Sequence, residues 1–118
     1  MDEKRNFELI ITVVNRGFAD DVMDAAKEVG ASGGTVLYAR GTGVHEAETF
    51  FGITIQPEKE VVLILTEYEK RKDIMKAIAR GAGLLKEGKG MSFSLPVEDI
   101  AGIVHMMARM EKEESENE

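Results

Sequence analysis

The segment Phe7–Val14 constrains the fold most, because it is apolar on both faces of a strand. In a strand, successive side chains point to opposite sides of the sheet. One side then carries Leu9, Ile11 and Val13, and the other carries Ile10, Thr12 and Val14. Two apolar faces are typical of a strand at the centre of a sheet, where other elements cover both sides. We therefore expect the chain to build a sheet around this segment.

The other periodic segments follow in the order of a split βαβ unit. Phe18–Val29 repeats its apolar residues at helical spacing and ends before Gly30. A second strand is predicted at Thr35–Arg40. A third strand region begins at Gly52, is interrupted by Pro57 and resumes at Glu60–Thr66. A second helix through Ile74 and Leu85 and a last strand at Met91–Leu95 follow. The order β-α-β-β-α-β predicts an α+β fold, a four-stranded antiparallel sheet with two helices on one face. Pro96–Asp99 is expected as a turn or short 3₁₀ segment, and Ile100–Met110 as an extra C-terminal element that fits strand and helix equally.

Only one face of the predicted sheet receives the helices. To the other face we assign Ile10, Val14, Val62 and Ile64. An uncovered apolar face usually marks contact with another protein, so we expect an oligomer. At the second helix, Thr66 and Glu69 have the spacing of a capping box, which predicts where that helix begins.

Charge separates one domain from a short acidic tail. Residues 111–118 contain five Glu and one Lys, which accounts for −4 of the net charge of −7. This tail has no apolar residue to offset the entropy of ordering. We expect a domain at residues 7–110 and a disordered tail at 111–118.

Several classes of protein are disfavoured by what the sequence lacks. It has no cysteine, no apolar run near the roughly 20 residues of a membrane span, and no basic stripe. These features argue against disulfides, membrane insertion and nucleic-acid binding. They suit a cytoplasmic protein.

Two glycine-rich loops are candidate anion sites. The first, Arg40–Gly43, follows a predicted strand, where close backbone approach and successive N–H groups suit a phosphate. The second, Gly88–Gly90, places the ammonium group of Lys89 between two glycines. Each loop also has a plainer interpretation, the first as a simple turn and the second as a solvated connector.

Other polar residues give weaker signals. His45, Glu46 and Glu48 could bind a divalent cation, but adjacent ligands define no coordination geometry and a solvated loop is the simpler interpretation. His105 lies in an apolar stretch and fits a packed or interface position. No Ser-His-Asp arrangement or nucleophile elbow is present. The sequence therefore favours binding over catalysis, with no required cofactor.

Three segments together resemble the P-II family of signal-transduction proteins. They are Val29–Val36, Arg40–Gly43 and, most specifically, Phe93–Ile100, within a similarity from about Phe7 to Ile103. The resemblance implies a ferredoxin-like domain that assembles as a homotrimer, with sheets inside and helices outside. Family members bind adenine nucleotides between subunits. A long loop after their second strand docks on enzymes or transporters of nitrogen metabolism.

The resemblance and the two glycine loops together give the expected ligand-binding positions. They are Thr35 at the start of the second strand, Arg40, Gly41 and Gly43 at the loop base, and Gly88, Lys89 and Gly90 before the last strand. The implied effector is ATP, ADP or AMP, and the implied partner a regulated enzyme or transporter.

The chain also departs from the family pattern. Where the family has a lysine and two arginines, this chain has Met91, Gly102 and Val104, and its loop after the second strand is shorter. Because one charge-assisted contact contributes about 1.5–3 kcal/mol, we expect weaker triphosphate binding. The alternative is a metal-binding trimer similar to the divalent-cation-tolerance proteins, with the loop histidine and glutamates as ligands.

Overall fold

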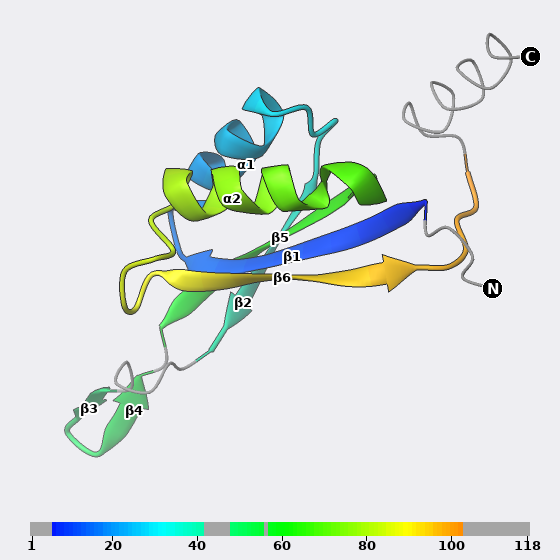
Figure 1. Cartoon of the computed structure of the whole chain (residues 1–118). Coiled ribbons are helices and arrows are strands. Elements are labelled where there is room, and N and C mark those ends of the chain that lie inside the picture. Colours follow the sequence, from blue (N-terminus) through cyan, green and yellow to red (C-terminus); the bar gives the residue numbers. More distant parts are fainter. Residues whose placement is uncertain (1–5, 42–47, 56, 103–118) are drawn as a thin grey trace, which may run out of the picture.

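The structure is a computed structural model that describes residues 6–41, 48–55 and 57–102. Its elements are β1 (Phe7–Asn15), α1 (Ala19–Glu28), β2 (Thr35–Arg40), β3 (Glu48–Phe50), β4 (Ile53–Ile55), β5 (Glu58–Glu67), η1 (Tyr68–Lys70), α2 (Arg71–Gly81) and β6 (Gly90–Val97). They form one main sheet, two α-helices and a separate hairpin (Figure 1). The predicted α+β class and the ferredoxin-like arrangement are confirmed.

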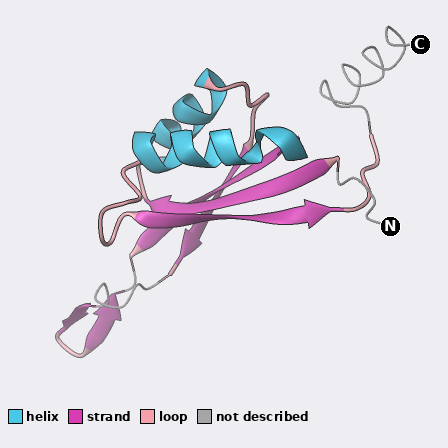
Figure 2. Ribbon diagram, viewed as in Figure 1, coloured by secondary structure: helices cyan, strands magenta, loops and turns pink. Residues whose placement is uncertain are grey.

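The main sheet is antiparallel, with the strand order β2-β5-β1-β6. β1 pairs with β5 on one side and with β6 on the other, which leaves β2 and β6 as the edges. Both helices cover the same face of this sheet (Figure 2). The central position of β1 is the one expected from its two apolar faces.

The hydrophobic core lies between the helices and one face of the two central strands. From the sheet it contains Ile10, Val14, Val62 and Ile64, and from the helices Val22, Ala26, Ile74 and Ile78. All eight are at most 1% exposed. Burying one such aliphatic side chain contributes about 1.5–3 kcal/mol, so these contacts hold the helices on the sheet.

The predicted choice of the uncovered face is wrong. The helices cover Ile10, Val14, Val62 and Ile64, the four residues expected on the open side. The open face instead carries Leu9, Ile11 and Val13 with their cross-strand partners Leu65, Leu63 and Val61. Strand periodicity separates two faces, but it does not say which one receives the helices when both are apolar. Since the covered face also holds Glu8 and Thr12, the open face is the more apolar of the two.

The start of the second helix also differs from the capping-box prediction. Thr66 lies within β5, and its hydroxyl donates to the Glu67 carbonyl at 3.3 Å. The 3₁₀ turn η1 then leads into α2. The Arg71 guanidinium donates to the Tyr68 carbonyl at 2.9 Å and lies 3.6 Å from the centre of the Tyr68 ring. The helix therefore begins through a backbone turn and an Arg–Tyr contact.

A short hairpin of β3 and β4 occupies the region predicted as a loop followed by an interrupted strand. Phe50 pairs with Ile53, and the turn residues Phe51 and Gly52 have φ values of 50° and 81°. Positive φ at both central residues is the signature of a type I′ turn. The hairpin forms its own sheet beyond one end of the main sheet (Figure 1). The sequence does not predict it, because this turn prefers Asn or Gly at its first central position, where the chain has Phe.

The last strand is longer than predicted. β6 includes Pro96 and Val97, which were expected in a turn or 3₁₀ segment. Proline has no N–H for a ladder, but an edge strand tolerates it on its unpaired side. His105 and the acidic tail lie outside the described residues.

Candidate functional site

Both glycine loops lie at the same end of the main sheet, which we call the loop end. Here β1 and β2 finish while β5 and β6 begin, because these two pairs of strands run in opposite directions. The pairing places Arg40 opposite Glu58, Asn15 opposite Lys59 and Val14 opposite Gly90. The fold thus gathers polar residues and glycines that are far apart in the sequence.

The first loop begins at the end of an edge strand. The Gly41 N–H donates to the Pro57 carbonyl at 3.4 Å, which joins the outgoing and returning chain at the loop base. This N–H is therefore engaged within the chain. The Arg40 side chain has no hydrogen bond or ion pair with another described residue, so its guanidinium is available to a ligand. Gly43 lies outside the described residues.

The second loop is held by contacts on both sides. Asn15 donates through Nδ2 to the Gly88 carbonyl at 3.0 Å. The ammonium group of Lys89 lies 5.3 Å from the centre of the Phe18 ring, within cation–π range. Among the residues that the structure describes, none accepts the Gly88 N–H. That N–H and the Lys89 ammonium are the groups this loop can offer to an anion.

Glycine is needed at positions 88 and 90 of this loop for two different structural reasons. Gly90 has φ of 135°, and a Cβ there would lie 2.2 Å from the Val13 carbonyl oxygen. Strand pairing alone therefore requires glycine at this position. Gly88 has φ of 80°, but a Cβ there would meet no atom of the described residues within 4 Å. Its glycine serves the left-handed turn and leaves the backbone accessible.

Within one chain, the two loops do not reach the same small ligand. Their strands β2 and β6 are opposite edges of the sheet, three strand spacings or about 14 Å apart. Thr35 lies apart from both, because six residues of extended chain separate it from Gly41 by about 20 Å. It pairs with Leu63 and so lies on the open face of the edge strand β2, level with the midpoint of β1. The structure brings the glycine loops to one end and leaves Thr35 elsewhere.

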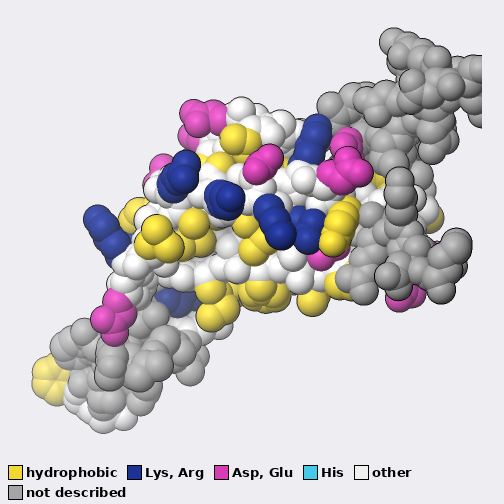
Figure 3. Space-filling view, in the orientation of Figure 1, with side chains coloured by type: hydrophobic (Ala, Val, Ile, Leu, Met, Phe, Trp, Pro, Cys, Tyr) yellow, Lys and Arg dark blue, Asp and Glu magenta, His cyan; other side chains and the backbone are white. Residues whose placement is uncertain are grey.

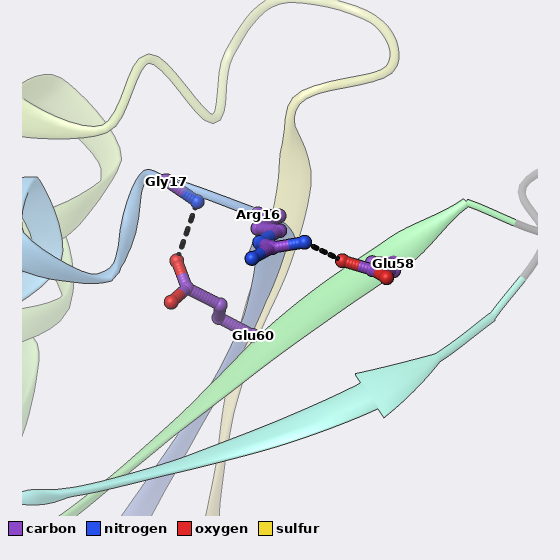
Figure 4. A network of polar contacts seen from close by, with 4 residues as sticks. All are labelled: Arg16, Gly17, Glu58 and Glu60. Carbon is purple, nitrogen blue, oxygen red and sulfur yellow. Dashed lines mark hydrogen bonds and ion pairs between the residues drawn. The ribbon is translucent and has the colours of Figure 1, made fainter.

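A polar network at the loop end has no counterpart in the sequence predictions. The Arg16 guanidinium forms an ion pair with Glu58, and Arg16 points toward that carboxylate in Figure 4. The Glu60 carboxylate accepts the N–H groups of Gly17 at 2.7 Å and Ala19 at 3.1 Å. No motif marks these residues, because strand pairing, and not sequence spacing, brings them together.

A cavity of about 540 Å³ adjoins this network. It is lined by Arg16, Tyr38, Ala39, Arg40, Glu58 and Lys59. Three cations and one carboxylate give this lining a net positive charge. Lys59 donates to Asn15 Oδ1 at 2.6 Å, and Asn15 in turn donates to Gly88, so the cavity is linked to the second loop.

The described residues provide no group of three or more side chains placed to hold a metal ion. His45 and Glu46, which the metal alternative requires, lie outside the described residues. That alternative stays a prediction. Within the described ranges, none of the helices is long and apolar enough to cross a membrane.

Comparison with known proteins agrees with this fold. The family described as "Nitrogen regulatory protein P-II" matches residues 7–106. A crystal structure of Arabidopsis thaliana PII bound to citrate is similar in fold, with a TM-score of 0.65 and 23% identity over 85% of this chain and 82% of that chain. No curated protein sequence matches significantly. Because the family match spans the whole βαββαβ unit, the chain belongs to the P-II family.

Proposed function

We propose that this protein is a P-II signalling regulator that binds a phosphate-bearing effector between the subunits of a trimer. The observation that carries the proposal is the placement of the two glycine loops. They share one end of the sheet but lie on opposite edges, about 14 Å apart. A single ligand can use both loops only if they come from neighbouring chains.

The open face of the sheet supports the trimer. It exposes large apolar side chains even on the edge strands, namely Leu37, Met91, Phe93 and Leu95, which are 39–60% exposed. Hydrophobic side chains line this side of the molecule in Figure 3, opposite the helices. Such a contiguous surface is costly in water and is normally covered by association.

The proposed cleft lies where the β2 edge of one chain meets the β6 edge of the next. The β6 side offers the Gly88 N–H and the Lys89 ammonium, and the β2 side offers the Arg40–Gly43 loop base. With few cations available, the site favours AMP or ADP over ATP. The role is binding in the cytoplasm, not catalysis.

The β3–β4 hairpin is the proposed contact with a regulated enzyme or transporter. Its turn residue Phe51 is fully exposed, and Ile53 is 66% exposed. Phe51 also has φ of 50°, which is unfavourable for a residue with a bulky side chain. An exposed aromatic side chain held in an unfavourable backbone conformation fits an anchor for an apolar pocket on a partner.

Calorimetry with AMP, ADP and ATP tests the cleft. Lys89→Ala should weaken binding about tenfold, the effect of losing roughly 1.4 kcal/mol from one charged contact. Lys86→Ala is the matched control, because Lys86 is also exposed and lies three residues earlier in the same connection. Tightest binding by ATP, with equal affinity for the Lys89 and Lys86 variants, would contradict this site.

A further inference from the structure

The two helices that cover the sheet carry opposite charge. α2 has four cations and one carboxylate, that of Asp73, which gives it a net charge of +3. α1 has four carboxylates and one cation, Lys27, which gives it a net charge of −3. The helices pack against each other, with α2 on the β6 side of the sheet and α1 on the β5 side. The helix-covered side of the molecule is therefore basic along one helix and acidic along the other.

Three of the α2 cations, Lys72, Lys76 and Arg80, form what we call the basic row. Residues four apart are neighbours on a helix surface, so these three side chains follow one another along α2. All three are exposed, and Lys and Arg side chains gather along this part of the molecule in Figure 3. Unlike Arg71, which donates to the Tyr68 carbonyl, none of the three has a hydrogen bond or ion pair with another described residue. The basic row is thus free to receive an acidic segment.

The chain leaves the sheet at the end where the basic row begins. Val97, at the end of β6, pairs with Phe7, which also pairs with Glu67 shortly before α2. The end of β6 and the start of α2 therefore lie at the same end of the sheet (Figure 1). The described residues finish at Gly102. Residues 103–110 span up to about 28 Å when extended, whereas α2 is about 16 Å long, so the segment that follows them can reach the whole row.

We propose that the acidic tail, residues 111–118, binds along the basic row of its own chain. The tail has a net charge of −4, which is opposite to that of α2 and nearly equal to it in size. α1 has the same sign as the tail and repels it, so α2 is the helix on which the tail settles. Single exposed ion pairs are weak, but a tethered segment has an effective concentration on the order of millimolar, which favours several weak contacts together.

The contact requires no fixed structure in the tail, because opposite charges attract over a Debye length of about 8 Å at physiological salt. A tail in this position shields α2 from other acidic partners. Its release would open a docking surface on the helix-covered side, separate from the open face and from the hairpin.

A spin label at the end of the tail tests the proposal in the full chain. The chain has no cysteine, so Glu118→Cys provides a single attachment point for a nitroxide. At low salt the nitroxide should remove most of the NMR amide signal of Lys72, Lys76 and Arg80, and less of the signal of Asp20 and Asp24 on α1. In 1 M salt, where the Debye length is about 3 Å, the lost signal should return.

A matched pair of variants separates this contact from random encounters. Lys76→Glu should restore most of the lost signal, because it reverses the central charge of the row. Lys27→Glu should leave the loss unchanged, since Lys27 is also an exposed helical lysine but lies on α1. Equal losses in the two variants, or a loss that persists in 1 M salt, would overturn the proposal.

Mixed samples show which chain the tail contacts. Spin-labelled chains are combined with isotope-labelled chains that carry no nitroxide. The α2 signals of the isotope-labelled chains should stay intact, because each tail binds its own chain. Loss of these signals would place the tail on a neighbouring subunit and overturn the assignment.

Discussion

Glu60 joins the sheet to the first helix through one carboxylate. It lies on β5, is only 8% exposed and accepts the N–H groups of Gly17 and Ala19. The first N–H groups of a helix have no partner within it, and the helix dipole favours a negative charge there. α1 has no side-chain cap at its own N-cap residue. Glu60 therefore takes the place of that cap from a strand 41 residues later in the chain.

Replacing Glu60 by Ala should lower the free energy of unfolding by about 1–3 kcal/mol, because two N–H groups near the helix start lose a charged acceptor. Urea denaturation measures this loss. Glu58→Ala is the control: its ion pair with Arg16 is between side chains 52% and 68% exposed, and such pairs contribute about 0–1 kcal/mol. Equal losses in the two variants would contradict the capping role.

At the scale of secondary structure, the sequence predicts those elements in which apolar residues recur at helix or strand spacing within one continuous segment. The strand Thr35–Arg40 has the predicted limits, and α1 lies within the predicted Phe18–Val29. The hairpin is not predicted, because strands of three residues each are too short to show a periodic pattern and Phe51 is not a residue typical of its turn. The polar network and the cavity are not predicted either, because they depend on which strands pair, and the periodicity of a segment does not indicate its pairing partner.

The hairpin turn gives a prediction about stability. Phe51→Asn should leave the melting temperature unchanged or raise it slightly, because Asn tolerates positive φ and the Phe51 side chain is fully exposed. Circular dichroism during heating measures the change. If the variant melted more than a few degrees lower, Phe51 would have a packing role, and its proposed function as a partner anchor would lose its support.

For the whole molecule, the sequence predicts an apolar sheet face without cover but assigns it to the wrong side. The composition of β1 holds the information that separates the faces. Glu8 and Thr12 lie on the side that the helices cover, whereas on the side of Leu9, Ile11 and Val13 the one polar residue of β1 is Asn15, at the end of the strand. A face that is more apolar than the core side of the same strand, and yet open, indicates burial between chains.

Light scattering coupled to size exclusion tests the trimer most directly, with a matched pair of variants. Leu95 is 48% exposed on the open face, and Leu85 is 87% exposed in the connection between α2 and β6, outside the strands of the sheet. Leu95→Lys should reduce the assembly, because a charge buried without a partner between sheets is strongly unfavourable. Leu85→Lys should leave it intact.

The wild-type protein and Leu85→Lys should both have a mass three times the 13.0 kDa of one chain. Leu95→Lys should have a lower mass. A wild-type mass of a single chain at micromolar concentration would contradict the account, because the two glycine loops would then have no neighbouring chain with which to form a site.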